Sequence, residues 1–149
     1  MATKGHINFR SDYKYQLVNN YEIYIGKEDP KIKIPIVPKS NILTHFIELD
    51  TDGNLLVKRD YAWDGPSGPV KDSNENMRAS LIHDALYQLM RQGELSQKTH
   101  RKGADQLFKD ICKEDGVSVY LASIYYKALR KFGKPAASPA NKKVVTRCP

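Results

Sequence analysis

The sequence has only two cysteines, Cys112 and Cys148, and they lie far apart in the chain. One falls inside an expected helix and the other lies next to the last residue, so their spacing does not indicate a disulfide framework. We therefore expect two free thiols in a reducing compartment, where disulfides are rare. Neither thiol is a basis for a mechanism.

Long apolar runs are also lacking. No segment approaches the roughly 20 apolar residues that cross a bilayer, and the first residues, MATKGHINFRSDYK, lack the apolar stretch of a secretory signal peptide. We expect no membrane-spanning helix and no export route of the chain's own. Internal repeats and low-complexity tracts are absent too.

The composition is that of a soluble globular protein. Of the 149 residues, 40% are hydrophobic and 28% are charged, and this length favours one domain with a core of its own. Lys and Arg number 24 against 17 Asp and Glu, so the formal net charge is +7. Such a charge favours a polyanionic partner. Nucleic acid, an anionic membrane surface and a phosphorylated substrate all fit that description.

Residues 1–60 are rich in strand-forming residues. The segment YKYQLVNNYEIYI, residues 13–25, has aromatic and β-branched residues on both sides of an Asn-Asn pair, which predicts two strands and a turn. Residues 45–63 predict a second hairpin with DTDGN as its turn. Between them, KIKIPIVPKSN is interrupted by two prolines and indicates an edge strand or an extended loop.

Residues 61–73 form an irregular loop rich in Pro and Gly, and helices follow. Three are predicted, at about 74–91, 96–114 and 118–131. A glycine follows each of them, at Gly93, Gly116 and Gly133, as is common beyond a helix C-terminus.

The last residues, 134–149, hold three prolines and several basic residues and predict a flexible or loosely docked tail. The expected fold class is α+β, as a single domain over 1–133. An N-terminal antiparallel sheet of hairpins would precede a C-terminal three-helix unit.

The first predicted helix contains SLIHDALYQLM, in which polar residues interrupt an apolar pattern. His83 and Tyr87 share a face, and Asp84 lies about 100° around the helix axis from His83. A histidine can act as general base on a water while a neighbouring carboxylate binds a cation. Such a base needs a carboxylate to fix its tautomer. Asp105 is the candidate, because it lies in an amphipathic helix where an acid is expected to have a partner.

The loop YAWDGPSGP concentrates Gly65, Gly68 and two prolines before this helix. Such a loop can direct backbone carbonyls and an N–H toward one point. Calcium accepts backbone carbonyls together with a carboxylate. The loop and Asp84 therefore predict a calcium site, and a loop N–H could help to stabilise an oxyanion.

These motifs carry a resemblance to a known enzyme family. The sequence resembles secreted phospholipase A2 in three successive features. They are a glycine-containing loop that begins with tyrosine, a helix with HDALY and a following helix with an aspartate. The match is closer to the disulfide-free phospholipase domains of parvovirus capsid proteins, whose ADxxF-type segment corresponds here to ADQLF. This resemblance covers residues 61–116. Residues 13–133 also resemble a family of phage and prophage proteins, domain of unknown function 1353. The likeness rests on the order of four features: DGPSGP, IHDALY, ADQLF and a final helix ending in FG.

The phospholipase resemblance implies roles for four side chains. His83 would activate the attacking water, Asp105 would orient His83, Tyr87 would hydrogen-bond to Asp105, and Asp84 would bind calcium. It thus implies a calcium-dependent ester hydrolase.

The resemblance also implies further calcium ligands in the loop. These would be main-chain oxygens near Trp63, Gly65 and Ser67, with Asp64 as an additional ligand. The loop departs from the family pattern, because it lacks a run of alternating glycines and its prolines remove two N–H groups. The flanking cysteines of the secreted enzymes are absent, as they are in the viral domains.

Structural interpretations stay open beside the catalytic one. His83 could be a hydrogen-bonded structural residue, Tyr87 a core residue, and Asp105 a partner of Arg101 or Lys109 on its own helix. The loop could simply be a tight turn between the sheet and the helix.

Two other functions also stay open. One is a metal-dependent phosphohydrolase of the HD superfamily, which needs another histidine upstream, where only His6 and His45 stand. The other is a non-catalytic virion component, assembly factor or inhibitor of host defence, since a fold does not establish a function. The phage resemblance implies a place in the infected bacterial cytoplasm or in the virion. The expected partner is phospholipid or an anionic membrane surface, with phage or host proteins and nucleic acid as alternatives.

Overall fold

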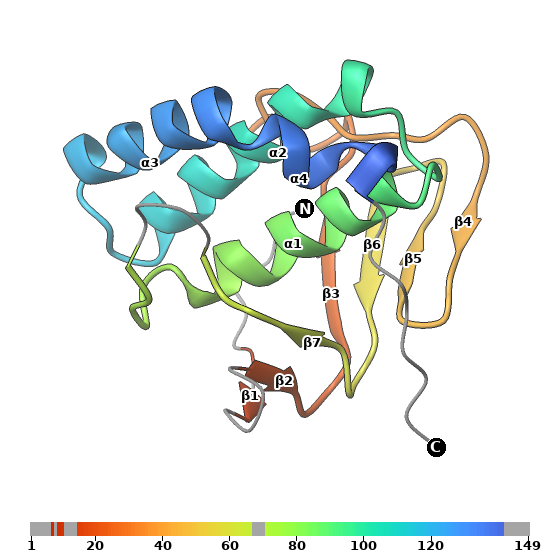
Figure 1. Cartoon of the computed structure of the whole chain (residues 1–149), viewed down its shortest axis with the longest axis horizontal. Helices are drawn as coiled ribbons and strands as arrows, with labels where there is room; N and C mark the ends of the chain where they lie inside the picture. Colours follow the sequence, from red (N-terminus) through yellow and green to blue (C-terminus); the bar gives the residue numbers. More distant parts are fainter. Residues whose placement is uncertain (1–6, 8, 11–14, 67–70, 142–149) are drawn as a thin grey trace.

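The computed structural model describes residues 7, 9–10, 15–66 and 71–141. Two antiparallel sheets come from the first half of the chain and helices from the second, so the predicted α+β class is confirmed (Figure 1). The smaller sheet has the order β1-β2-β7, with β1 at Phe9–Arg10, β2 at Tyr15–Leu17 and β7 at Ala62–Trp63. The larger sheet has the order β3-β6-β5-β4, with β3 at Tyr21–Tyr24, β4 at Ile42–Leu43, β5 at Ile47–Leu49 and β6 at Asn54–Val57.

The hairpin predicted over residues 13–25 is wrong, because its two strands belong to different sheets. β2 pairs with β1 and β7, whereas β3 pairs with β6. The Asn-Asn segment carries the chain from one sheet to the other, and the side chain of Asn20 accepts a hydrogen bond from the backbone N–H of Arg59 (2.8 Å). β7 and β6 lie far along the chain from β2 and β3, and a local pattern cannot indicate such pairings.

The second predicted hairpin is confirmed in its central part. β5 and β6 pair across the DTDGN turn, in which the Asp50 carboxylate accepts the backbone N–H groups of Asp52, Gly53 and Asn54. The end of the segment, β7, leaves this hairpin and joins the other sheet. The proline-containing segment at 31–41 is an extended loop, and its Ile36 N–H donates to the carbonyl of Ile25 (2.9 Å).

The helices are α1 at Met77–Arg91, α2 at Gln97–Glu114, α3 at Val119–Phe132 and the short α4 at Lys134–Ala137, followed by a 3₁₀ turn, η1, at Pro139–Asn141. The first three agree with the predicted ranges to within three residues. Ser96 and Ser118 cap α2 and α3 by accepting backbone N–H groups. Gly93 and Gly116 take positive φ angles of 76° and 111°, as the predicted C-terminal glycines require.

The predicted tail is described over residues 134–141, and this part is folded; residues 142–149 lie outside the described residues. Residues 134–141 form α4 and η1, which pack against α1, and Ala137 is completely buried. The guanidinium of Arg91 donates a hydrogen bond to the carbonyl of Ala136 (2.8 Å). A fourth helix therefore joins the three that were expected.

α1 is the central element of the helical layer. Thirteen of its fifteen residues are buried, and it crosses the strands while α2 and then α3 lie further out (Figure 1). Arg78, at its beginning, donates hydrogen bonds to Tyr21 of β3 and to Glu114 and Asp115 at the end of α2. Cys112 is buried without a disulfide, as expected, and burial raises the pKa of its thiol to about 12.

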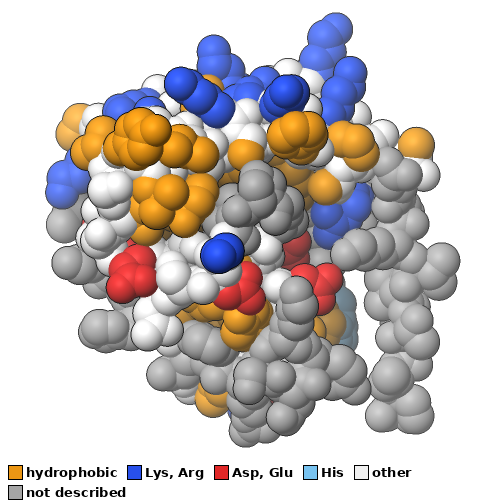
Figure 2. Space-filling view, turned by 60° about the vertical axis from the view of Figure 1, so that its left-hand side comes forward, with side chains coloured by type: hydrophobic (Ala, Val, Ile, Leu, Met, Phe, Trp, Pro, Cys, Tyr) orange, Lys and Arg blue, Asp and Glu red, His pale blue; other side chains and the backbone are white. Residues whose placement is uncertain are grey.

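Basic side chains are unevenly distributed over the surface. On the face in Figure 2 most of them lie toward the upper edge, at the level of α2 and α3, and the acidic side chains lie lower. Among the helices of the described residues, none combines the length and the apolar character that crossing a membrane requires.

Candidate functional site

His83, Asp105 and Tyr87 form one hydrogen-bonded cluster between α1 and α2. His83 Nε2 lies 2.8 Å from Asp105 Oδ1, and the Tyr87 hydroxyl donates to the same oxygen at 2.6 Å. Asp105 is fully buried, and His83 is 7% exposed. The two predicted contacts of Asp105 are therefore present. The catalytic roles of the three residues stay predictions.

Two arginines complete the surroundings of Asp105. Arg130 of α3 donates to Oδ2 at 2.8 Å, and Arg101, one turn before Asp105 on α2, lies 3.5 Å from that oxygen. The pair with Arg101 was an open structural alternative. Arg130 was not predicted, since no local pattern shows where α3 crosses α2. Asp105 thus joins residues from three helices.

The contacts of Asp105 keep its carboxyl ionised at neutral pH. Burial acts to raise its pKa, but the hydrogen bond and charge of His83 and the hydrogen bonds from Tyr87 and Arg130 outweigh burial, so the pKa is lowered. An ionised carboxylate only accepts hydrogen bonds, so Nε2 of His83 is the donor. In the neutral imidazole the other nitrogen, Nδ1, therefore has a free lone pair.

Aromatic rings hold the imidazole in place. The ring of Tyr87 lies 4.0 Å from that of His83, centre to centre, and the ring of Phe108 meets it edge-on at 5.4 Å. Burial and the nearby Asp105 charge raise the pKa of Tyr87 well above its usual value, so this hydroxyl stays protonated and remains a donor. His83 is thus fixed on one side by its partner acid and on others by ring contacts.

A small pocket lies beside this cluster. Its lining residues come from the loop, from all three long helices and from both members of the HD pair: Gly65, Pro66, Ser80, His83, Asp84, Phe108 and Leu129. Its volume is about 20 Å³, which is room for about one water molecule. The pocket therefore places a water-sized space against a histidine whose tautomer is fixed.

Asp84 lines the same pocket but has other contacts. Its Oδ2 accepts a hydrogen bond from the Tyr61 hydroxyl at 2.8 Å, and that hydroxyl also lies 3.1 Å from Gln88 Oε1. Burial and the Asp84 charge raise the pKa of Tyr61, which keeps it protonated. Tyr61 thus holds Oδ2 of Asp84 in place.

The predicted calcium ligands in the loop lie in different environments, and only some of the described ones reach the pocket. The backbone of Gly65 reaches the pocket, Asp64 is exposed, and the Trp63 side chain is buried with its indole N–H donating to Ser80 (3.0 Å). Ser67 lies outside the described residues. Gly65 has a φ of 79°, and a Cβ there would lie 2.7 Å from the ring of Tyr15, so this position requires glycine.

The potential ligand atoms near Asp84 are oxygens, which is the element that calcium prefers as a ligand. This set of oxygens is small, however: over the ranges that the structure describes, no three His, Cys, Asp or Glu side chains gather as a metal site. Calcium takes 6 to 8 oxygens, so Asp84 and the loop backbone would need water or substrate oxygens to complete the shell.

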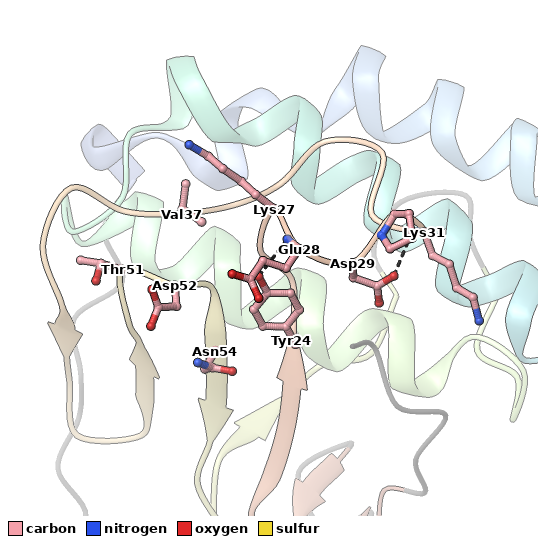
Figure 3. A pocket seen from close by; sticks show the side chains of 10 residues that line it. Tyr24, Lys27, Glu28, Asp29, Lys31, Val37, Thr51, Asp52 and Asn54 are labelled. Carbon is pink, nitrogen blue, oxygen red and sulfur yellow. Dashed lines mark hydrogen bonds between the residues drawn. The ribbon is translucent and has the colours of Figure 1, made fainter.

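A separate and larger cleft lies at the end of the larger sheet. It has a volume of about 950 Å³ and lies between the loop after β3 and the β5–β6 turn (Figure 3). Tyr24 lies at its centre, with Lys27, Glu28 and Asp52 around it. It shares no lining residue with the His83 pocket, so the predicted site does not open into it.

Comparison with known proteins gives a match to a protein family. A family model described as "Protein of unknown function (DUF1353)" matches residues 57–129, just under half of the chain. This supports the expected likeness to that family, and the matched segment contains His83, Asp84, Tyr87 and Asp105. No curated protein and no solved structure matches the chain.

Proposed function

We propose that the protein hydrolyses a carboxylic ester of the phospholipid type, with His83 as the general base that takes a proton from water. The observation that carries this proposal is the 2.8 Å contact between His83 Nε2 and the buried, ionised Asp105, next to a pocket of the size of one water. A base held in this way can deprotonate a water at Nδ1. The phospholipase likeness of the HDALY and ADQLF segments supports the same reaction class.

Each residue of the cluster has a part in the proposed reaction. Nδ1 of His83 accepts the proton of the attacking water and later returns it to the leaving alcohol. Asp105 holds the imidazole in the required tautomer and stabilises the imidazolium that forms. Tyr87 and Arg130 hold Asp105, so they are positioning residues.

Calcium would be held by Asp84 and the loop backbone at Gly65 in this proposal. When bound, the ion would polarise the ester carbonyl as a Lewis acid. Tyr61 would hold Asp84 in position through its hydrogen bond to Oδ2. The ester itself is far larger than the 20 Å³ pocket, so it would lie at the mouth of the pocket and only the water would enter.

The test is fatty-acid release from a short-chain phosphatidylcholine kept below its critical micelle concentration, with calcium and with chelator. We expect calcium-dependent release by the wild type and a loss of at least about 100-fold in His83→Ala, the usual minimum contribution of a general base. The matched control is His100→Ala, a half-buried histidine of α2 outside the cluster. Equal activity of wild type and His83→Ala would contradict the proposal.

A non-catalytic binding protein is the second candidate. It is favoured by the fact that Asp105 is bonded to residues of three helices, so the cluster would stabilise the fold without any reaction. No release by a folded wild-type protein, with or without calcium, would support it. An HD-type phosphohydrolase has less support, because the described parts of the chain gather no three metal-ligating side chains.

A further inference from the structure

The outer surface of α3 is unusually apolar for a surface helix. Within the described ranges, six large hydrophobic residues are exposed, and five of them belong to α3: Val119 (68%), Tyr120 (78%), Leu121 (39%), Ile124 (41%) and Phe132 (62%). The sixth is Leu43 of β4. Single exposed apolar residues are normal, but a concentration of them on one helix indicates an interaction surface.

These residues follow the helical period. Ala122 and Leu129 are buried against the rest of the protein, and the opposite stripe consists of Tyr120, Ile124, Lys127 and Lys131, at spacings of four, three and four residues. Leu121 and Phe132 flank this stripe. We call the exposed side chains of Tyr120, Leu121, Ile124, Lys127, Lys131 and Phe132 the α3 face.

The α3 face is purely basic in its charge. α3 contains no Asp or Glu, and Lys127, Arg130 and Lys131 lie in its second half. Arg130 is engaged with Asp105, whereas Lys127 and Lys131 form no ion pair with any described residue. Lys131 lies over the ring of Phe132 (5.3 Å), so basic and apolar groups meet on one surface. Figure 2 shows this combination, with hydrophobic side chains directly below the basic upper edge.

We propose that the α3 face binds the surface of an anionic lipid bilayer. Tyr120, Leu121 and Ile124 would enter the headgroup region, and Lys127 and Lys131 would contact lipid phosphates, as in interfacial amphipathic helices. α3 is the outermost helix of its layer (Figure 1), and a convex helix suits a broad, deformable surface better than a groove. Nucleic acid would satisfy the lysines but leave the apolar side chains in water.

This inference goes beyond the proposed hydrolysis, because it concerns binding and would hold for a non-catalytic protein too. It is linked to the candidate site by α3 itself, since Leu129 lines the His83 pocket from the buried side of the same helix. A protein bound through the α3 face would therefore hold that pocket close to the lipid.

The first experiment is co-sedimentation with vesicles of phosphatidylcholine and phosphatidylglycerol, in the His83→Ala background so that lipid is not consumed. The double variant Tyr120→Ser/Ile124→Ser should lose binding roughly tenfold or more, because apolar insertion is removed. Leu43→Ser is the matched control. It removes a side chain that is 75% exposed, on the edge strand of the sheet, and should bind like the parent protein.

The second experiment tests the charges. Lys127→Gln/Lys131→Gln should weaken binding about fivefold for each lysine, whereas Lys27→Gln/Lys39→Gln, two exposed lysines elsewhere, should change it little. Vesicles of pure phosphatidylcholine should bind the parent protein weakly.

Three results would overturn the inference. One is unchanged vesicle binding by Tyr120→Ser/Ile124→Ser. Another is a dimer in size-exclusion chromatography that the same variant breaks, which would show that a second copy covers the face. The third is an equal loss of binding in Lys27→Gln/Lys39→Gln and in Lys127→Gln/Lys131→Gln, which would show binding by net charge alone. Failure of the hydrolysis proposal is separate, because it is measured on monomeric lipid, where the α3 variants should keep wild-type activity.

Discussion

At the scale of single residues, Asp105 combines a structural and a proposed functional role. Its two oxygens contact four side chains, two of them arginines, so its charge is compensated although the side chain is fully buried. A buried carboxylate is costly unless it is paired in this way. Removing the charge should therefore affect stability as well as any activity.

We expect Asp105→Asn to lower the free energy of unfolding by about 3 kcal/mol at pH 7, because two partly buried arginines lose their buried counter-charge. Urea denaturation measures this. Asp110→Asn is the control, because this half-exposed residue of the same helix pairs with Lys33 and Lys113 at 3.5 Å, and its loss should cost under about 1 kcal/mol. Similar values for both variants would mean that the Asp105 pairs contribute little.

The same substitution should change the pH dependence of stability. The pKa of Asp105 is lower in the folded protein than its ordinary value of 3.8, so folding favours the ionised form. Its stabilisation is therefore complete well above pH 3.8 and is lost as the pH falls below that value. The difference in unfolding free energy between wild type and Asp105→Asn should shrink from pH 7 to pH 3; a constant difference would contradict this.

Tyr87→Phe removes a single hydroxyl from the cluster and keeps the ring. We expect a loss of about 1–2 kcal/mol of stability, because a hydrogen bond to a charged group is removed. Because Tyr87 only positions Asp105, any ester hydrolysis should fall far less than in His83→Ala. Tyr125→Phe, on α3, is the control. Equal hydrolytic activities of Tyr87→Phe and His83→Ala would show that Tyr87 contributes to the reaction as much as His83 does.

At the scale of elements, the junction between α3 and α4 lies directly on the cluster. Gly133 has an ordinary helical φ of −79°, but a Cβ added there would lie 2.6 Å from the Tyr87 hydroxyl and 2.5 Å from the Leu129 carbonyl. Glycine is thus required by close approach and not by backbone conformation.

Gly133→Ala should destabilise the protein by about 1–3 kcal/mol, as overpacking does, and displace the Tyr87 hydroxyl from Asp105. Thermal unfolding and the proposed esterase assay both report on this. Gly93→Ala is a matched control, because an alanine there would be strained by its backbone conformation and not by a steric clash. Its φ is 76°, and no atom lies within 4 Å of the added Cβ. It should lose about 1 kcal/mol from backbone strain while any activity stays unchanged.

The sequence predicts elements well where the signals are local. The helices agree with the structure because caps such as Ser96 and glycines such as Gly93 and Gly116 lie at their ends. The pairing of β2 with β7 and of β3 with β6 could not be predicted, because these strands lie far apart along the chain. Arg130 was missed for the same reason, since its contact with Asp105 depends on how α3 crosses α2. The His83–Asp105 contact was predictable because two adjacent helices joined by a short turn pack antiparallel.

At the scale of the whole molecule, Arg78 links the sheet to the helices. It is 3% exposed and donates to Tyr21, Glu114 and Asp115 at distances of 2.7–3.0 Å. Arg78→Met should lower the free energy of unfolding by about 3 kcal/mol, because two carboxylates lose their partner. Arg59→Met, at an exposed residue whose side chain pairs with the neighbouring Asp60 at 3.6 Å, should lower it by under about 0.5 kcal/mol. Chemical denaturation measures both, and equal effects would contradict a linking role for Arg78.

The almost complete burial of α1 has a consequence for internal motion. Arg78 fixes the first turn of this helix to the end of α2, His83 and Tyr87 fix its middle to Asp105, and Arg91 fixes its last turn to Ala136. Sliding or rotating α1 by one residue would break all of these contacts together, so its amide hydrogens can exchange with deuterium only when the whole domain opens. α1 should therefore contain the slowest-exchanging amides of the chain, while the outer α3 can fluctuate around it.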